Sequence, residues 1–133
     1  MFLDTNVLAA GIAGTGLCAD LLDYVKQVHE AVCCEQVHQE LPKALKKMRL
    51  EPFIIEIACE EMRRSCLTVP TPTRPPKQSR DPKDDAILQA ALDADCGWLV
   101  SGDKDLTSLK RVQRMPITTP RDFLEALGVV DPY

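Results

Sequence analysis

The chain has 133 residues, of which 45% are hydrophobic and 27% charged, and this length suffices for one domain, residues 1–133, with its own core. No apolar run reaches the roughly 18 residues that a membrane-spanning helix needs, and no signal peptide precedes the first apolar run, so we expect a cytoplasmic protein without a membrane segment. The six cysteines form no CxxC pair, and neither histidine lies at a metal-ligand spacing from them. This favours reduced thiols that pack as small apolar side chains over disulfides or zinc.

The net charge of −4 is unevenly distributed. Residues 1–40 hold six acids and one base, residues 41–80 hold nine bases and four acids, and residues 81–133 hold ten acids and six bases. The acidic segments would repel a polyanion unless a cation neutralised them, whereas the middle segment could attract one. The simpler interpretation of the middle segment is a set of solvated helix faces.

Short apolar runs predict buried strands, and helical spacing of apolar residues predicts helices between them. The strands are expected at residues 1–4, 31–34, 65–69, 98–100 and 115–118. The helices are expected over 17–30, from 35 with a kink or restart at Pro42, from 52 and from 82 to about 95. A short helix is expected to end at 109, and a last helix to cover 121–127. Residues 9–16 contain three glycines, which favours a loop or a short frayed helix, and residues 70–80 predict a proline-rich surface loop.

Strands that alternate with helices predict an α/β fold, a three-layer α/β/α arrangement around a central parallel sheet of four to five strands. Asp81 followed by Pro82 is typical of a helix start. In the helix that opens at Pro52, the inward positions are expected to be Phe53, Ile54, Ile57, Ala58 and Met62.

In a parallel sheet, ligands collect at the carboxyl ends of the strands. Asp4 ends the first strand between apolar neighbours, and burying a lone charge is costly unless it is paired or binds a metal. Asp103 follows the fourth strand, and Glu40 lies in the helix entered from the second. Asp84 and Asp85 lie in the first turn of the helix before the fourth strand. We therefore expect acids from four segments to meet at one sheet edge.

Each of these acids also has an ordinary structural interpretation. Glu40 can be a helix-edge glutamate and Asp103 a turn residue, while Asp105 is expected to cap a helix. Asp84 is harder to explain in this way, because at 100° per residue it falls in the middle of an apolar arc. Asp85 lies further round the helix and is the second choice for the third acid.

Clustered carboxylates raise one another's pKa, and oxygen-rich sites suit Mg²⁺ or Mn²⁺. Such ions activate water and stabilise charge on a phosphodiester. No Ser-His-Asp or Cys-His arrangement competes with this chemistry, and no phosphate-binding P-loop occurs.

Four motifs appear in order along the chain: LDTNV at 3–7, EQVHQEL at 35–41, RDPKDDAILQAA at 80–91 and LVSGDKDL at 99–106. Over residues 1 to about 127 the chain resembles the PIN-domain ribonucleases, especially the subgroup related to VapC-type toxins of toxin–antitoxin pairs. Carried over by position, the resemblance implies catalytic acids at Asp4, Glu40, Asp84 and Asp103.

The resemblance implies an endoribonuclease that depends on Mg²⁺ or Mn²⁺. Asp4, Asp84 and Asp103 would bind the metal, and Asp84 fits the motif better than Asp85. The supporting residues would be Asn6, Ser101 and Asp105. It further implies RNA as substrate, a cognate antitoxin protein as partner and a homodimer.

Two other functional classes stay open at this stage. One is a catalytically inactive module that keeps the fold and binds RNA or a partner protein. The other is an aspartate-based phosphatase or phospho-acceptor domain, which also places an aspartate at a strand end. The dehalogenase-type phosphatases need a second aspartate two residues after the nucleophile, where this chain has Asn6.

Overall fold

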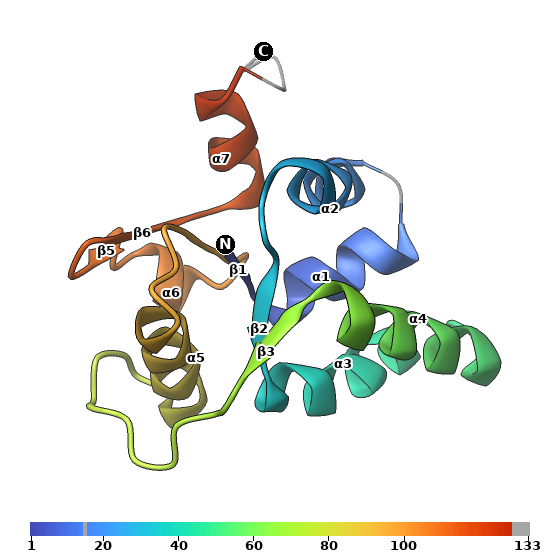
Figure 1. The fold of residues 1–133 in the computed structure, drawn as a ribbon, viewed down its shortest axis with the longest axis horizontal. Coiled ribbons are helices and arrows are strands. Elements are labelled where there is room, and N and C mark those ends of the chain that lie inside the picture. The colour runs from blue at the N-terminus through green and yellow to red at the C-terminus, as the bar shows by residue number, and fades with distance from the viewer. Residues whose placement is uncertain (15, 129–133) are drawn as a thin grey trace.

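The computed structural model describes residues 1–14 and 16–128, and this part of the chain contains six strands and seven helices (Figure 1). The strands are β1 (Phe2–Leu3), β2 (Val32–Cys34), β3 (Leu67–Val69), β4 (Leu99–Val100), β5 (Arg111–Val112) and β6 (Met115–Thr118). The helices are α1 (Thr5–Ala13), α2 (Leu17–Val28), α3 (Glu35–Lys47), α4 (Pro52–Ser65), α5 (Pro82–Asp93), α6 (Lys104–Thr107) and α7 (Pro120–Ala126).

The strands form one sheet in the order β3-β2-β1-β4-β6-β5. All neighbouring pairs are parallel except the β5–β6 hairpin, so the predicted α/β class with a mostly parallel sheet is confirmed. The sheet has one strand more than the four to five expected. The additional strand, β5, has only two residues, one exposed and one half-buried, and so shows no apolar pattern in the sequence.

Helices cover both faces of the sheet. Figure 1 shows α1 to α4 on one side of β2 and β3 and α5 on the other. The central strands β1 and β4 are buried throughout, as expected for parallel strands between two helical layers. Their carboxyl ends lead directly into Asp4 and Ser101, which places these two polar residues at the same edge of the sheet.

The first helix is longer and more regular than the glycines in 9–16 suggest. Residues up to Ala13 belong to α1, so the prediction of a loop or frayed helix is wrong for them. Gly11 is needed at this position for contact and not for flexibility. A Cβ added there would lie 2.9 Å from the carbonyl oxygen of Cys18 in α2, so the missing side chain lets the two helices approach closely.

The predicted restart at Pro42 is also wrong, because α3 is a single helix from Glu35 to Lys47 with Pro42 inside it. Its apolar stripe explains why the helix tolerates the proline. Val37, Leu41 and Leu45 are fully buried, and this burial holds both sides of Pro42 against the core.

The inward face of α4 was predicted correctly for Ala58 and Met62 and incorrectly for three other residues. Phe53, Ile54 and Ile57 are 57%, 40% and 56% exposed. The helix packs through Ile55, Ala58, Cys59 and Met62, so Ile55 and Cys59 take the place of the three exposed residues. Apolar residues occur on both faces of this helix, so periodicity alone does not select the buried one.

Within residues 1–14 and 16–128, no single helix is long and apolar enough to cross a membrane. Helices α1 and α2 together reach that length and hydropathy, but they are bent by 102° relative to each other. Buried apolar residues of both helices belong to the protein core, among them Leu8, Leu21 and Val25.

Candidate active site

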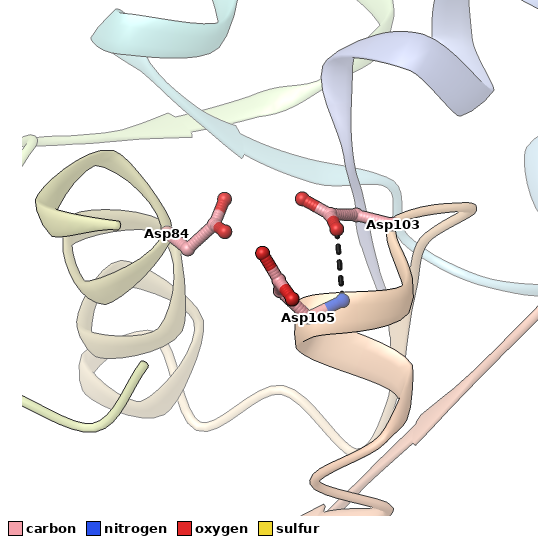
Figure 2. A group of neighbouring side chains, drawn as sticks. All are labelled: Asp84, Asp103 and Asp105. Atoms are coloured by element: carbon pink, nitrogen blue, oxygen red, sulfur yellow. Dashed lines mark hydrogen bonds between the residues drawn. The ribbon is translucent and has the colours of Figure 1, made fainter. Parts of the chain in front are cut away.

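Three carboxylates converge beside the carboxyl end of β4. Asp84, Asp103 and Asp105 each offer one oxygen atom, and these atoms lie within 4.8 Å of one another. Figure 2 shows that Asp84 projects from α5 toward the two aspartates at the start of α6. Residues about twenty positions apart in the sequence therefore form one acidic cluster.

The local sequence explains how α6 presents its two acids. Asp103 is the N-cap of α6, and its carboxylate accepts a hydrogen bond of 2.9 Å from the backbone N–H of Asp105. The expectation that Asp105 caps a helix is thus wrong, because Asp103 has that role. Asp105 lies in the first turn instead, where its carboxylate faces Asp84.

Asp4 is held at the same sheet edge by two short hydrogen bonds. The hydroxyl of Ser101 donates to Oδ2 of Asp4 over 2.7 Å, and the backbone N–H of Thr5 donates to Oδ1 over 2.7 Å. The Ser101 oxygen also accepts the backbone N–H of Asp103 over 3.0 Å. Ser101 therefore connects Asp4 to the loop of Asp103. Asp4 does not belong to the group within 4.8 Å, and its role as a direct metal ligand stays a prediction.

The two adjacent aspartates of α5 have different surroundings. Asp85 is 5% exposed, and its Oδ1 accepts hydrogen bonds from the backbone N–H groups of Gln78 and Ser79 over 2.9 and 2.7 Å. The Ser79 hydroxyl donates to the same oxygen over 2.8 Å. Asp85 therefore anchors the proline-rich loop, whereas Asp84 faces the acidic cluster.

Glu40 lies beside the start of α1. Its Oε1 accepts a hydrogen bond of 2.7 Å from the Gln36 side chain, and its Oε2 accepts one of 3.3 Å from the Thr5 hydroxyl. Thr5 directly follows Asp4, so Glu40 is at the margin of the site and outside the three-acid group. Asn6 shares a pocket with Thr5 and Glu40. Gln36 and Thr5 were missed from the sequence, since neither residue type carries a charge that would mark it.

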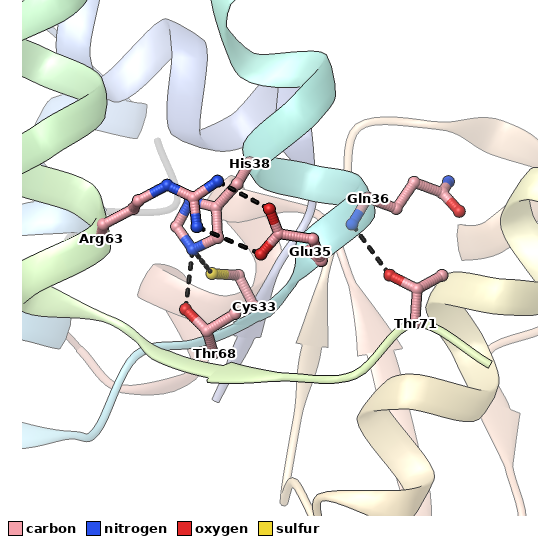
Figure 3. Close-up of polar contacts among 7 residues, drawn as sticks. All are labelled: Cys33, Glu35, Gln36, His38, Arg63, Thr68 and Thr71. Carbon is pink, nitrogen blue, oxygen red and sulfur yellow. Dashed lines mark hydrogen bonds and ion pairs between the residues drawn. The ribbon is translucent and has the colours of Figure 1, made fainter.

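A second polar cluster fixes the start of α3 (Figure 3). The guanidinium of Arg63 donates two hydrogen bonds to the Glu35 carboxylate, over 2.7 and 3.1 Å. Nε2 of His38 lies 2.8 Å from the Thr68 hydroxyl and 3.1 Å from Sγ of Cys33. These contacts join α3 to α4, β2 and β3. They account for Glu35 and His38 as structural residues that orient the helix carrying Glu40.

The surroundings of the acids disfavour their charged forms. Burial, together with the negative charges of Asp103, Asp81 and Asp4, raises the pKa of Asp84 to about 7. Burial also raises the pKa of Asp4, although the hydrogen bonds from Ser101 and Thr5 counteract part of this effect. A bound cation would offset the repulsion between the carboxylates and would lower their pKa values.

The donor set fits a hard divalent cation. Every side chain in the three-acid group offers a carboxylate oxygen, the ligand preferred by Mg²⁺ and Mn²⁺. No nitrogen or sulfur ligand belongs to this group, and such ligands are what zinc prefers. Asp84, Asp103 and Asp105 could therefore hold such a cation, with Asp4 next to them through Ser101.

The sequence matches a known protein family. A family model described as PIN domain matches residues 1–105, a range that contains Asp4, Glu40, Asp84, Asp103 and Asp105. Neither the curated proteins nor the solved structures that were compared give a match. The family model covers more than half of the chain, and the mostly parallel α/β sheet agrees with it. The chain therefore belongs to the PIN domain family.

Proposed function

We propose that this protein is an endoribonuclease that hydrolyses RNA phosphodiester bonds with the help of Mg²⁺ or Mn²⁺. The observation that carries the proposal is the convergence of Asp84, Asp103 and Asp105 within 4.8 Å at the carboxyl end of β4. Membership of the PIN domain family supports it, because PIN domains are generally nucleases and typically use divalent metals.

In this proposal, the acidic residues of the site have separate roles. Asp84 and Asp103 hold the cation, with Asp105 or Asp4 completing the set, and Ser101 keeps Asp4 oriented through the 2.7 Å hydrogen bond. When bound, the cation supplies a Lewis acid for the phosphate oxygens and lowers the pKa of water. Glu40 lies at the margin, where its carboxylate can orient a water molecule or a ribose hydroxyl.

The test is cleavage of a labelled single-stranded RNA in the presence of Mg²⁺, Mn²⁺ or EDTA. We expect cleavage with either metal and none with EDTA. Asp103→Asn and Asp84→Asn should lose activity, while Asp23→Asn, an exposed change on α2, should keep it. Cleavage that persists in EDTA, or full activity in Asp4→Asn, would contradict the proposed chemistry.

We further propose a role as the cytoplasmic toxin of a toxin–antitoxin pair, acting as a homodimer. The resemblance to VapC-type toxins supports this role, and so do Phe53, Ile54 and Ile57, whose exposed side chains offer apolar surface for a protein partner. Induced expression should stop growth of a host cell, and the Asp103→Asn variant should not. A small neighbouring reading frame whose product restores growth would identify the antitoxin. Equal growth arrest by the wild type and by Asp103→Asn would contradict a toxin that acts as a nuclease.

The principal alternative is an inactive module that binds RNA or a protein without cleaving. Titration calorimetry with Mn²⁺ separates the two, because an inactive module has no need to bind the ion. A protein that binds RNA but shows neither metal binding nor cleavage would support the alternative.

A further inference from the structure

A pocket of about 350 Å³ opens beside Thr5 and Glu40, between the start of α1, the C-terminal part of α3 and the first turn of α5. This size is at the lower end of the range for small-molecule sites, about 300 to 1,000 Å³. The pocket is lined by Thr5, Asn6, Glu40, Lys43, Ala44, Lys47, Met48 and Lys83.

Three lysines give the pocket a positive charge. Lys43 and Lys47 are one turn apart on α3, and Lys83 comes from α5. Among the residues that the structure describes, none of these three lysines has a carboxylate within 4.0 Å. They are therefore available to an anion that enters from solvent.

The carboxylate of Glu40 is the only acidic group among the lining residues. Both of its oxygens already accept hydrogen bonds, from the Gln36 side chain and from the Thr5 hydroxyl. The lining therefore carries three positive charges and one negative charge, and it is positive overall. A singly charged phosphodiester suits this balance better than a neutral ligand does.

The remaining wall is apolar. Ala44 and Met48 line it, and Met48 is 42% exposed. A thioether beside open solvent is an adaptable surface for a sugar or a base. A ligand that combines an anion with a flat, partly apolar body matches both walls, and a nucleotide unit has this composition.

The pocket adjoins Asp4 through Thr5. Thr5 lines the pocket, and its backbone N–H binds Oδ1 of Asp4. The Gln36 side chain, which binds Glu40, also donates to the backbone oxygen of Lys83 over 3.4 Å, so the α3 and α5 walls are connected. The pocket therefore adjoins Asp4, and a strand of RNA that passes Asp4 can continue into it.

Two arginines of the middle segment are placed differently. Arg63 is paired with Glu35, and Arg64 lies 3.8 Å from Glu60, both away from this pocket. We infer that the pocket formed by Lys43, Lys47 and Lys83 is the subsite for the nucleotide next to the cleaved bond, with its phosphate on the lysines and its sugar or base against Ala44 and Met48. This inference rests on the proposed ribonuclease function.

The test measures binding without cleavage. A fluorescein-labelled single-stranded RNA is titrated with protein in EDTA, and its anisotropy gives the Kd over a series of salt concentrations. The double variant Lys43→Gln/Lys47→Gln should bind about tenfold more weakly than the wild type, since two charge-assisted contacts to one phosphate are lost. Its salt dependence should fall by about 0.7 in the slope of log Kd against log salt, the value for one phosphate on a single strand.

The matched control is Lys26→Gln/Lys46→Gln, which removes the same charge from exposed helix positions outside this pocket. It should bind within about twofold of the wild type and keep the salt slope. Equal weakening in the two double variants would overturn the subsite in favour of general attraction, and so would a wild type that binds no RNA. Cleavage of RNA by the wild type with Mg²⁺ is measured separately, so the subsite can fail while the ribonuclease function stands.

Discussion

Ser101 and Asp4 end neighbouring parallel strands and are joined by a hydrogen bond of 2.7 Å from the serine hydroxyl to Oδ2 of the aspartate. The same hydroxyl oxygen accepts the backbone N–H of Asp103 over 3.0 Å. Ser101 is fully buried, so this geometry is protected from water. One side chain thus sets the position of two acids of the proposed site, and its hydrogen bond counteracts part of the rise that burial causes in the pKa of Asp4.

Replacing Ser101 by alanine should lower the cleavage rate by about 10- to 100-fold, the usual effect of removing a group that orients a metal ligand. Burial raises the pKa of Asp4 and the Ser101 hydrogen bond lowers it, so the variant should carry a higher Asp4 pKa. The acidic limb of the pH–rate profile should move to higher pH. Ser65→Ala, an exposed change on α4, is the control. A slower enzyme with an unmoved profile would mean that Ser101 acts on packing alone.

The two neighbouring aspartates of α5 should separate stability from metal binding. Asp85→Asn weakens the hydrogen bonds that hold Gln78 and Ser79, and it should lower the free energy of unfolding by about 1 to 3 kcal/mol in urea denaturation. Its affinity for Mn²⁺ should stay near that of the wild type. Asp84→Asn should lose Mn²⁺ binding in calorimetry, while its free energy of unfolding should not fall. Loss of Mn²⁺ binding in Asp85→Asn with the fold intact would show that Asp85, and not Asp84, binds the metal.

The sequence predicted the class of the fold, because alternating strands and helices leave few topologies. It also indicated the sheet edge, because Asp4 and Asp103 each come shortly after an apolar strand. It placed Asp84 in the middle of an apolar arc, and the structure turns this carboxylate toward Asp103. The anchoring of the proline-rich loop by Asp85 was not predictable, since it depends on backbone N–H groups in a segment without periodicity.

Other errors have a similar origin in tertiary contacts. Gly11 looked like a source of flexibility, but the neighbouring helix requires its missing side chain. The inward face of α4 was misassigned in part, because Phe53 and Ile57 are apolar yet exposed. Asp103 caps α6, and not Asp105 as predicted, since the choice between two aspartates in one turn depends on where the strand ends.

The raised pKa of Asp84 predicts a pH dependence of stability in the absence of metal. The carboxyl titrates near pH 7 in the folded protein and near its ordinary value of 3.8 in the unfolded chain. The folded state therefore retains a proton that the unfolded state has lost, and stability declines as the pH rises from about 4 through about 7. In EDTA, Asp84→Asn should melt at a higher temperature than the wild type at pH 8, and the difference should shrink at pH 5.

The control for this comparison is Asp93→Asn at the other end of α5, which should change the melting temperature equally at both pH values. Mg²⁺ should raise the melting temperature of the wild type at pH 8 more than that of Asp84→Asn, because ligand binding stabilises the folded state. A wild type that is as stable as Asp84→Asn at pH 8 would show that the acidic cluster carries no electrostatic strain.

Asp105 offers the sharpest test of the three-acid group, because it does not cap α6 and its carboxylate lies within 4.8 Å of those of Asp84 and Asp103. If it binds the cation, Asp105→Asn should weaken Mn²⁺ binding by at least about tenfold, because even a group that only orients a metal ligand contributes about that much. The free energy of unfolding without metal should not fall, since removing a clustered negative charge relieves repulsion. Asp20→Asn, a change in the first turn of α2, is the control. Unchanged Mn²⁺ affinity in Asp105→Asn together with a loss in Asp4→Asn would move the third ligand from α6 to the end of β1.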